Sequence, residues 1–127
     1  MKSFETTVDR PLDQVESEVR AALVAEGFGV LTEIDVAATL AAKLGVQRPA
    51  MRILGACNPS LAHRALEIEP SVSLMLPCNV VVESTPEGTR VSVADPAELL
   101  GTPQLADLAA EAAGHLQKVI GAVAAAR

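Results

Sequence analysis

The stretch NVVVESTPEGTRVSVA, residues 79–94, decides the fold class of this chain. Two apolar runs, 79–83 and 90–94, flank a short connection in which Pro86 and Gly88 occupy positions that are typical of a hairpin loop. Strands joined this closely run antiparallel, because a parallel pair needs a crossover of about a dozen residues or more. The stretch therefore argues against a doubly wound parallel sheet.

Upstream of the hairpin, strand-like and helix-like segments alternate. Apolar periodicity predicts strands at 2–8, 28–34, 49–57 and 72–76. Periodicity together with capping residues predicts helices at 11–26, 36–44 and 59–66, a helical turn at 97–100, and a last helix from 102 to 126. An alternating first half combined with a hairpin indicates an α+β fold. We expect a mixed or mainly antiparallel sheet of about five to six strands, covered by helices.

The composition limits what the protein can be. A chain of 127 residues with 50% hydrophobic content suits a single domain, 1–127, that buries one core without metal or disulfide. Only 2% of the residues are aromatic, so the chain offers few side chains on which nucleic-acid bases could stack, and its net charge of -6 repels the phosphates of a nucleic-acid backbone. We expect no nucleic-acid partner, no membrane partner and a cytoplasmic location, since no secretion signal or membrane-spanning run is visible.

The two cysteines stand in similar surroundings, Cys57-Asn58-Pro59 and Pro77-Cys78-Asn79. In a reducing compartment they are expected to be thiols. Cys57 ends a predicted strand and Asn58 caps the following helix, whose dipole favours a thiolate, so Cys57 is the candidate nucleophile. The alternative is that both cysteines are small buried residues and Asn58 is only a cap.

If the two corners converge at one end of the sheet, they frame a small pocket. The candidate ligand-binding residues are then Cys57, Asn58, Ser60, Cys78 and Asn79, and the free N–H groups of the helix start favour a small anionic ligand. His63 and His115 are the only histidines and no zinc-type spacing is present, so we expect no metal and no cofactor.

Three segments, 26–35, 54–59 and 76–82, resemble the signature segments of domain of unknown function 302, a family of small bacterial and archaeal proteins. The resemblance extends over about residues 27–95. It implies a compact α+β domain that is often a homodimer and has no established activity, so no catalytic residues can be carried over. Small residues on the last helix could support the dimer; they are Ala106, Ala109, Ala110, Ala113 and Ala124.

Two hypotheses about function remain open at this point. The first is a small-ligand-binding or interaction domain, a homodimer that holds a molecule at the two Cys-Asn corners without covalent turnover. The second is a thiol-based redox or sulfur-transfer protein, with Cys57 as nucleophile and Cys78 as the resolving thiol.

Overall fold

The computed structural model describes residues 1–126 and contains a five-stranded sheet in which every neighbouring pair is antiparallel. The strand order is β1-β5-β4-β3-β2. The strands are β1 (Ser3–Val8), β2 (Gly29–Asp35), β3 (Met51–Cys57), β4 (Cys78–Thr85) and β5 (Gly88–Ala94). The predicted α+β class is confirmed, and the hairpin of residues 79–94 forms β4 and β5.

Helices follow the strands where capping residues predicted them. They are α1 (Leu12–Ala25), α2 (Val36–Leu44), α3 (Pro59–Ile68), α4 (Pro96–Leu99) and α5 (Ala106–Ala125), with 3-10 turns η1 (Pro70–Met75) and η2 (Pro103–Leu105). The side chains of Asp35, Asn58 and Asp95 accept backbone N–H groups at the starts of α2, α3 and α4. None of the helices in residues 1–126 combines the length and the apolar character that a membrane crossing requires.

The predicted strand at 72–76 is wrong. Residues 70–75 form the 3-10 turn η1, in which the Glu69 carboxylate accepts hydrogen bonds from both the backbone N–H and the hydroxyl of Ser71. Pro70 fixes φ for the first position of the turn, and the chain then reaches a cis Leu76–Pro77 bond. The alternation that suggested a strand reflects one buried residue, Val72, beside the exposed Leu74.

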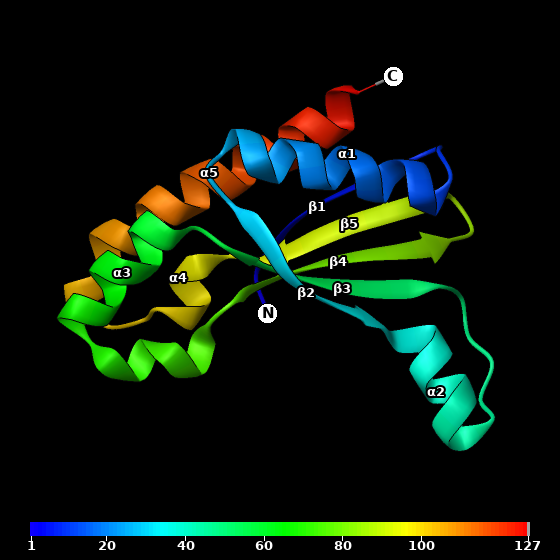
Figure 1. Ribbon diagram of the computed structural model, residues 1–127. Helices are drawn as coiled ribbons and strands as arrows, with labels where there is room; N and C mark the ends of the chain where they lie inside the picture. The colour runs from blue at the N-terminus through cyan, green and yellow to red at the C-terminus, as the bar shows by residue number, and fades with distance from the viewer. Residues whose placement is uncertain (127) are drawn as a thin grey trace.

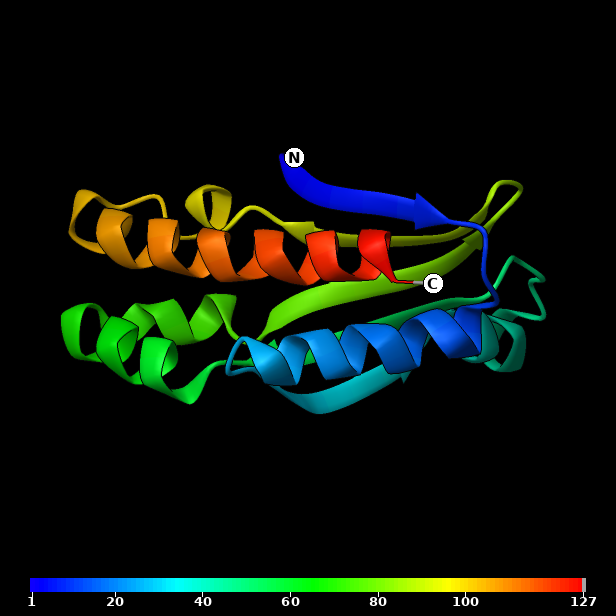
Figure 2. The same cartoon turned by 90° about the horizontal axis from the view of Figure 1, so that it is seen from above.

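One face of the sheet is covered by α1 and α5, which lie side by side across it (Figures 1 and 2). Their apolar side chains meet those of the strands in the main core, where Val15, Leu54, Val82 and Leu116 are fully buried. A second, smaller core lies beyond the strand ends, between α3, η1, η2 and the first half of α5. We call this part the α3 lobe; its buried residues are Leu61, Ala65, Val72, Leu105, Leu108 and Ala112.

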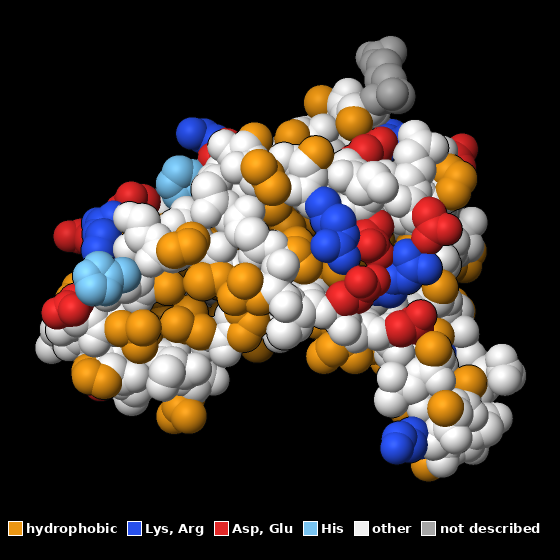
Figure 3. Space-filling view, viewed as in Figure 1, with side chains coloured by type: hydrophobic (Ala, Val, Ile, Leu, Met, Phe, Trp, Pro, Cys, Tyr) orange, Lys and Arg blue, Asp and Glu red, His pale blue; other side chains and the backbone are white. Residues whose placement is uncertain are grey.

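The other face of the sheet carries no helix along its middle (Figure 1). Residues opposite each other in an antiparallel pair share a face, so the register places Ile34, Ile53, Val81, Ser92 and Glu5 in one row across this uncovered face. A bulge in β2 between residues 30 and 32 brings Ile34 onto it. The α3 lobe and α2 project beyond the sheet at its two ends, which gives the molecule the shape of an arch (Figures 1 and 3).

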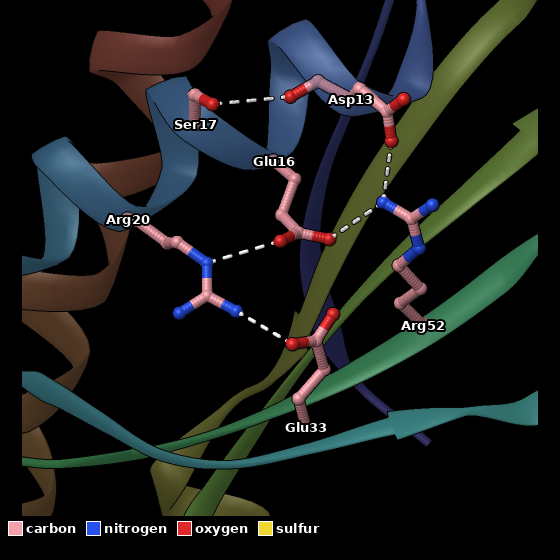
Figure 4. Close-up of polar contacts among 6 residues, drawn as sticks. All are labelled: Asp13, Glu16, Ser17, Arg20, Glu33 and Arg52. Carbon is pink, nitrogen blue, oxygen red and sulfur yellow. Dashed lines mark hydrogen bonds and ion pairs between the residues drawn. The ribbon is translucent and has the colours of Figure 1, made fainter.

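Ion pairs tie α1 to the edge of the sheet on its covered side (Figure 4). Arg52 Nη1 of β3 donates to Asp13 Oδ1 at 2.7 Å and to Glu16 Oε1 at 2.9 Å. Arg20 bridges the other Glu16 oxygen at 3.1 Å and Glu33 of β2 at 3.2 Å. The two carboxylates of α1 raise the pKa of Arg52 above its usual value, mainly by accepting these hydrogen bonds. These ion pairs therefore hold α1 against β2 and β3.

Candidate functional site

A hollow of about 750 Å³ lies where the uncovered face of the sheet meets the α3 lobe. Its rim is apolar: Leu74 and Met75 come from η1 and Leu99 from α4. Its floor is formed by polar side chains of the strands. We call this hollow the groove.

The register of the strands positions the floor of the groove. Glu83 of β4 lies opposite Arg90 of β5, and Arg90 Nη2 donates to Glu83 Oε1 at 3.0 Å. One row along, Ser92 lies opposite Glu5 of β1, while Asn79 is exposed near the start of β4. The floor thus offers amide, hydroxyl and carboxylate groups to a molecule that enters from solvent.

The charge of the floor is unequal. Glu83 is neutralised by Arg90, but Glu5 is exposed and takes part in no ion pair among residues 1–126. The side chains of the floor, two carboxylates and one guanidinium, carry a net negative charge. A cation or a hydrogen-bond donor is therefore favoured there over an anion.

The two cysteines line a second and much smaller hollow, a crevice of about 40 Å³ in the α3 lobe. Apart from Cys57, Asn58 and Cys78, the side chains around it are apolar, among them Phe28 and Leu61. Hydrophobic side chains gather on the same lobe in the space-filling view (Figure 3). Cys78 also lines the groove, so this residue forms part of the wall between the two hollows.

Both cysteines are free thiols and are half-buried. Burial raises the pKa of the Cys78 thiol, and the nearby Cys57 raises it further. Cys78 is therefore held in its protonated, weakly nucleophilic form at neutral pH. The pair is adjacent, since Ala56 lies opposite Cys78 in the register, but its surroundings do not favour a thiolate at Cys78.

The other predicted site residues are distributed over three places. Asn58 Oδ1 accepts the Leu61 N–H at 3.2 Å and its Nδ2 donates to the Glu26 carbonyl oxygen at 3.3 Å, so this amide caps α3 and anchors the end of α1. Ser60 is exposed and lines neither hollow, whereas Asn79 lines the groove. The structure brings Cys57 and Cys78 together and separates the two asparagines.

The histidines serve as partners of carboxylates. His115 Nδ1 lies 2.8 Å from Glu26 Oε1, which links α5 to the end of α1, and His63 lies 3.8 Å from Glu67. No cluster of metal-binding side chains is found within residues 1–126. Neither histidine lines the groove or the crevice, so neither stands beside a thiol as a base would.

Sequence reasoning missed the polar floor, namely Glu5, Glu83 and Arg90. A signal for part of it was present, because opposite charges at positions 83 and 90 flank the predicted hairpin and can pair across it. Glu5 gave no signal, since its place depends on β1 pairing with β5 at the far end of the chain.

These features define a class: a small α+β domain with a two-helix layer on one sheet face and an open groove on the other. The chain belongs to the family described as "Domain of unknown function DUF302", whose sequence model matches residues 4–123. This range is wider than the 27–95 segment that the motifs suggested.

A solved relative shares the whole architecture. The crystal structure of an uncharacterized conserved DUF302 protein from Bacillus stearothermophilus superposes with a TM-score of 0.89 at 28% identity. The match covers 97% of this chain and 98% of the other. No curated protein matches the sequence. The comparisons thus give the family and the fold and attach no reaction to either.

Proposed function

We propose that this protein is a non-covalent binding domain whose site is the groove, and that its ligand is a small polar molecule bearing a positive charge. The observation that carries the proposal is the groove itself: a hollow of about 750 Å³ with an apolar rim and a polar floor. Ligand sites in proteins typically span roughly 300–1,000 Å³ and combine apolar walls with a few polar groups.

Binding without covalent chemistry is favoured because the groove holds no activated nucleophile. Cys78 is the thiol in its wall, and burial raises the pKa of that thiol. No histidine lines the groove within residues 1–126, so a general base of that kind is absent from it.

The expected charge of the ligand follows from Glu5. This exposed carboxylate has no ion-pair partner among residues 1–126, and a bound cation would supply one. The sequence suggested a small anion at the two Cys-Asn corners; in the groove, an anion would meet Glu5 and Glu83 and would have to draw Arg90 away from its partner. We keep the anion as the competing outcome of the same experiment.

The test measures binding of putrescine and choline against phosphate and acetate by thermal shift and calorimetry. Glu5→Gln keeps the shape of the floor but removes its unpaired charge, and it should weaken amine binding about fivefold, which corresponds to about 1 kcal/mol. Glu87→Gln, in the exposed hairpin turn, is the matched control and should leave the affinity unchanged. Binding of anions alone, strengthened by Glu5→Gln, would reverse the assigned charge, and no binding at all would remove the proposal.

A second candidate is the thiol-based redox or sulfur-transfer role, favoured by the adjacency of Cys57 and Cys78 in one crevice. It is tested by the rate of iodoacetamide alkylation in the single variants Cys57→Ser and Cys78→Ser. We expect Cys78, measured in Cys57→Ser, to react more slowly than free cysteine at pH 7. If either thiol reacts faster than free cysteine near neutral pH, the thiol role gains over non-covalent binding.

A further inference from the structure

We infer that Cys57 and Cys78 bind a soft monovalent metal ion, Cu(I), between their two sulfur atoms at the crevice of the α3 lobe. The ion is held by two thiolates and by no histidine or carboxylate. This site is separate from the floor of the groove, so the inference does not rest on the proposed amine ligand. It gives the crevice a function of its own.

The topology brings the two cysteines to the same end of the sheet. Cys57 is the last residue of β3 and Cys78 is the first residue of β4, and the two strands are antiparallel neighbours in which Ala56 lies opposite Cys78 (Figure 1). Both cysteines line one crevice of about 40 Å³. This volume is far below that of an ordinary organic-ligand site but is sufficient for a single ion. The fold thus brings two thiols from distant parts of the chain to one small space.

The ligand set decides which ion fits. Within residues 1–126, no three side chains of His, Cys, Asp or Glu come together, as a zinc or calcium site would require. His63 and His115 line neither the crevice nor the groove. Two thiolates without a further ligand suit a soft ion that accepts a low coordination number, and Cu(I) is the biological metal ion with that preference.

The expectation that no metal binds was based on the spacing of ligands along the chain. Zinc sites show such a spacing because pairs of their ligands lie only a few residues apart. Cys57 and Cys78 come instead from two strands, and the pairing of β3 with β4 sets their separation. A site made of these two residues therefore leaves no spacing motif in the sequence.

The surroundings of the thiols favour this complex. Apart from Asn58, the other side chains around the crevice are apolar, among them Phe28, Leu61 and Leu108, so little water reaches the bound ion. A Cu(I) ion with two thiolates carries one negative charge, and burying that charge costs free energy. The ten-residue helix α3 begins just after Cys57, and the positive end of its dipole offsets part of this cost.

Binding exchanges protons for the metal ion. Each thiol releases its proton to solvent, each sulfur donates an electron pair to Cu(I), and copper keeps its oxidation state. Burial holds Cys78 in the protonated form while the crevice is free of metal, but a cation beside the sulfur lowers the cost of the thiolate. Both cysteines are half-buried, which leaves the ion a path from solvent.

Anaerobic titration of the reduced protein with Cu(I), in competition with bicinchoninate, tests the inference. The wild-type protein should bind a single Cu(I) per chain, and X-ray absorption should show two sulfur ligands. Cys57→Ser and Cys78→Ser should each weaken binding by about tenfold or more, since loss of even an outer partner of a metal ligand costs about 10–100-fold. Met75→Leu removes a thioether that lines the groove but not the crevice, and this matched control should leave the affinity unchanged.

A second measurement needs no substitution. One equivalent of Cu(I) should protect both cysteines of the wild-type protein from iodoacetamide, as counted by mass spectrometry. Zn(II) at the same concentration should protect neither, because the crevice offers only two of the four ligands that this ion prefers. A large excess of bicinchoninate should restore both reactions, which distinguishes a bound ion from a disulfide.

The outcomes separate this inference from the proposed amine site. Failure of the wild-type protein to retain Cu(I), a smaller loss of affinity in either serine variant, or a third protein ligand in the X-ray absorption spectrum overturns the inference. Glu5→Gln should leave the Cu(I) affinity unchanged. A protein that binds amines but no Cu(I) keeps the groove as its site, and one that binds Cu(I) but no amine keeps the crevice alone.

Discussion

Leu54 and Ile53 are neighbours on β3, but they belong to the two faces of the sheet. Leu54 points to the side covered by α1 and α5 and is completely buried, whereas Ile53 points to the uncovered side and is only half-buried. The strand has apolar side chains on both sides: Met51 and Ile53 lie on the uncovered side, and Leu54 and Ala56 lie on the covered side. The difference shows that an apolar strand face is not by itself evidence of a core: one face holds the fold together, and the other remains available for a partner.

The strongest test of this difference uses the two neighbours themselves. Leu54→Ala should lower the free energy of unfolding by about 3 kcal/mol, because it removes buried volume from a packed core. Ile53→Ala should cost about 1 kcal/mol in dilute protein, because its side chain keeps part of its contact with water in the monomer. Urea unfolding at low micromolar protein concentration measures both losses of unfolding free energy. Equal losses would show that Ile53 is as well packed in solution as Leu54, which contradicts the difference between the two faces.

Gly55 is the exception on the uncovered face, because it is buried there beside Thr32 and Pro77. A Cβ at this position would collide with the Thr32 hydroxyl and lie 2.9 Å from Pro77 Cγ. Gly55→Ala should therefore destabilise the protein by about 2 kcal/mol in urea unfolding. Adding Thr32→Ala should recover part of that loss, and a neutral Gly55→Ala would mean that the wall formed by Pro77 moves freely.

The ion pairs that fix α1 on the covered side should matter less than its apolar contacts. Arg52→Ala removes the contacts to Asp13 and Glu16 shown in Figure 4 and should cost about 1 kcal/mol, since both pairs are partly open to water. Thermal unfolding at 0.1 M and 1 M NaCl should show the cost shrinking with salt. Lys118→Ala, on an exposed position of α5, is the control; a loss as large as that of Leu54→Ala would place the network among the main supports of the fold.

The smallest expected effect is the pH dependence contributed by the pair between α3 and α5. Arg64 donates to Glu111 at 3.1 Å and this hydrogen bond lowers the pKa of the Glu111 carboxyl. A carboxyl whose pKa is lower in the folded state stabilises the fold above its ordinary pKa of about 4.3, and this contribution is lost as the pH falls through the folded pKa. Arg64→Ala should return the Glu111 pKa to its ordinary value in an NMR titration; an unchanged pKa would mean that the pair does not persist in solution.

Much of the fold was predictable because local chemistry fixes it. The Pro86 and Gly88 connection determined an antiparallel hairpin, and Asp35 and Asn58 marked the starts of two helices through the hydrogen bonds that their side chains make. The error at 72–76 has a local cause as well. Val72, Leu74 and Leu76 alternate as in a strand, but the capping by Glu69 and the φ of Pro70 favour a turn.

The site was less predictable than the fold. The sequence placed Cys57 at a strand end and left open whether Cys78 lies beside it, and the structure places both on one crevice. It could not show that the Asn58 amide is hydrogen-bonded to the backbone of Leu61 and Glu26. Nor could it show that Asn79 lines the groove on the uncovered face of the sheet. Those differences depend on contacts between segments far apart in the chain.

Taken alone, the sequence determined the elements of this protein, their antiparallel hairpin and its family, because propensity, capping and turn geometry act over a few residues. Only the tertiary structure decided which face of the sheet α1 and α5 cover, and hence where the groove lies. The reason is that β3 is apolar on both sides, so the burial of its residues is assigned by the helices that pack on one of them, and β1 supplies Glu5 to the groove only by pairing with a strand more than eighty residues away.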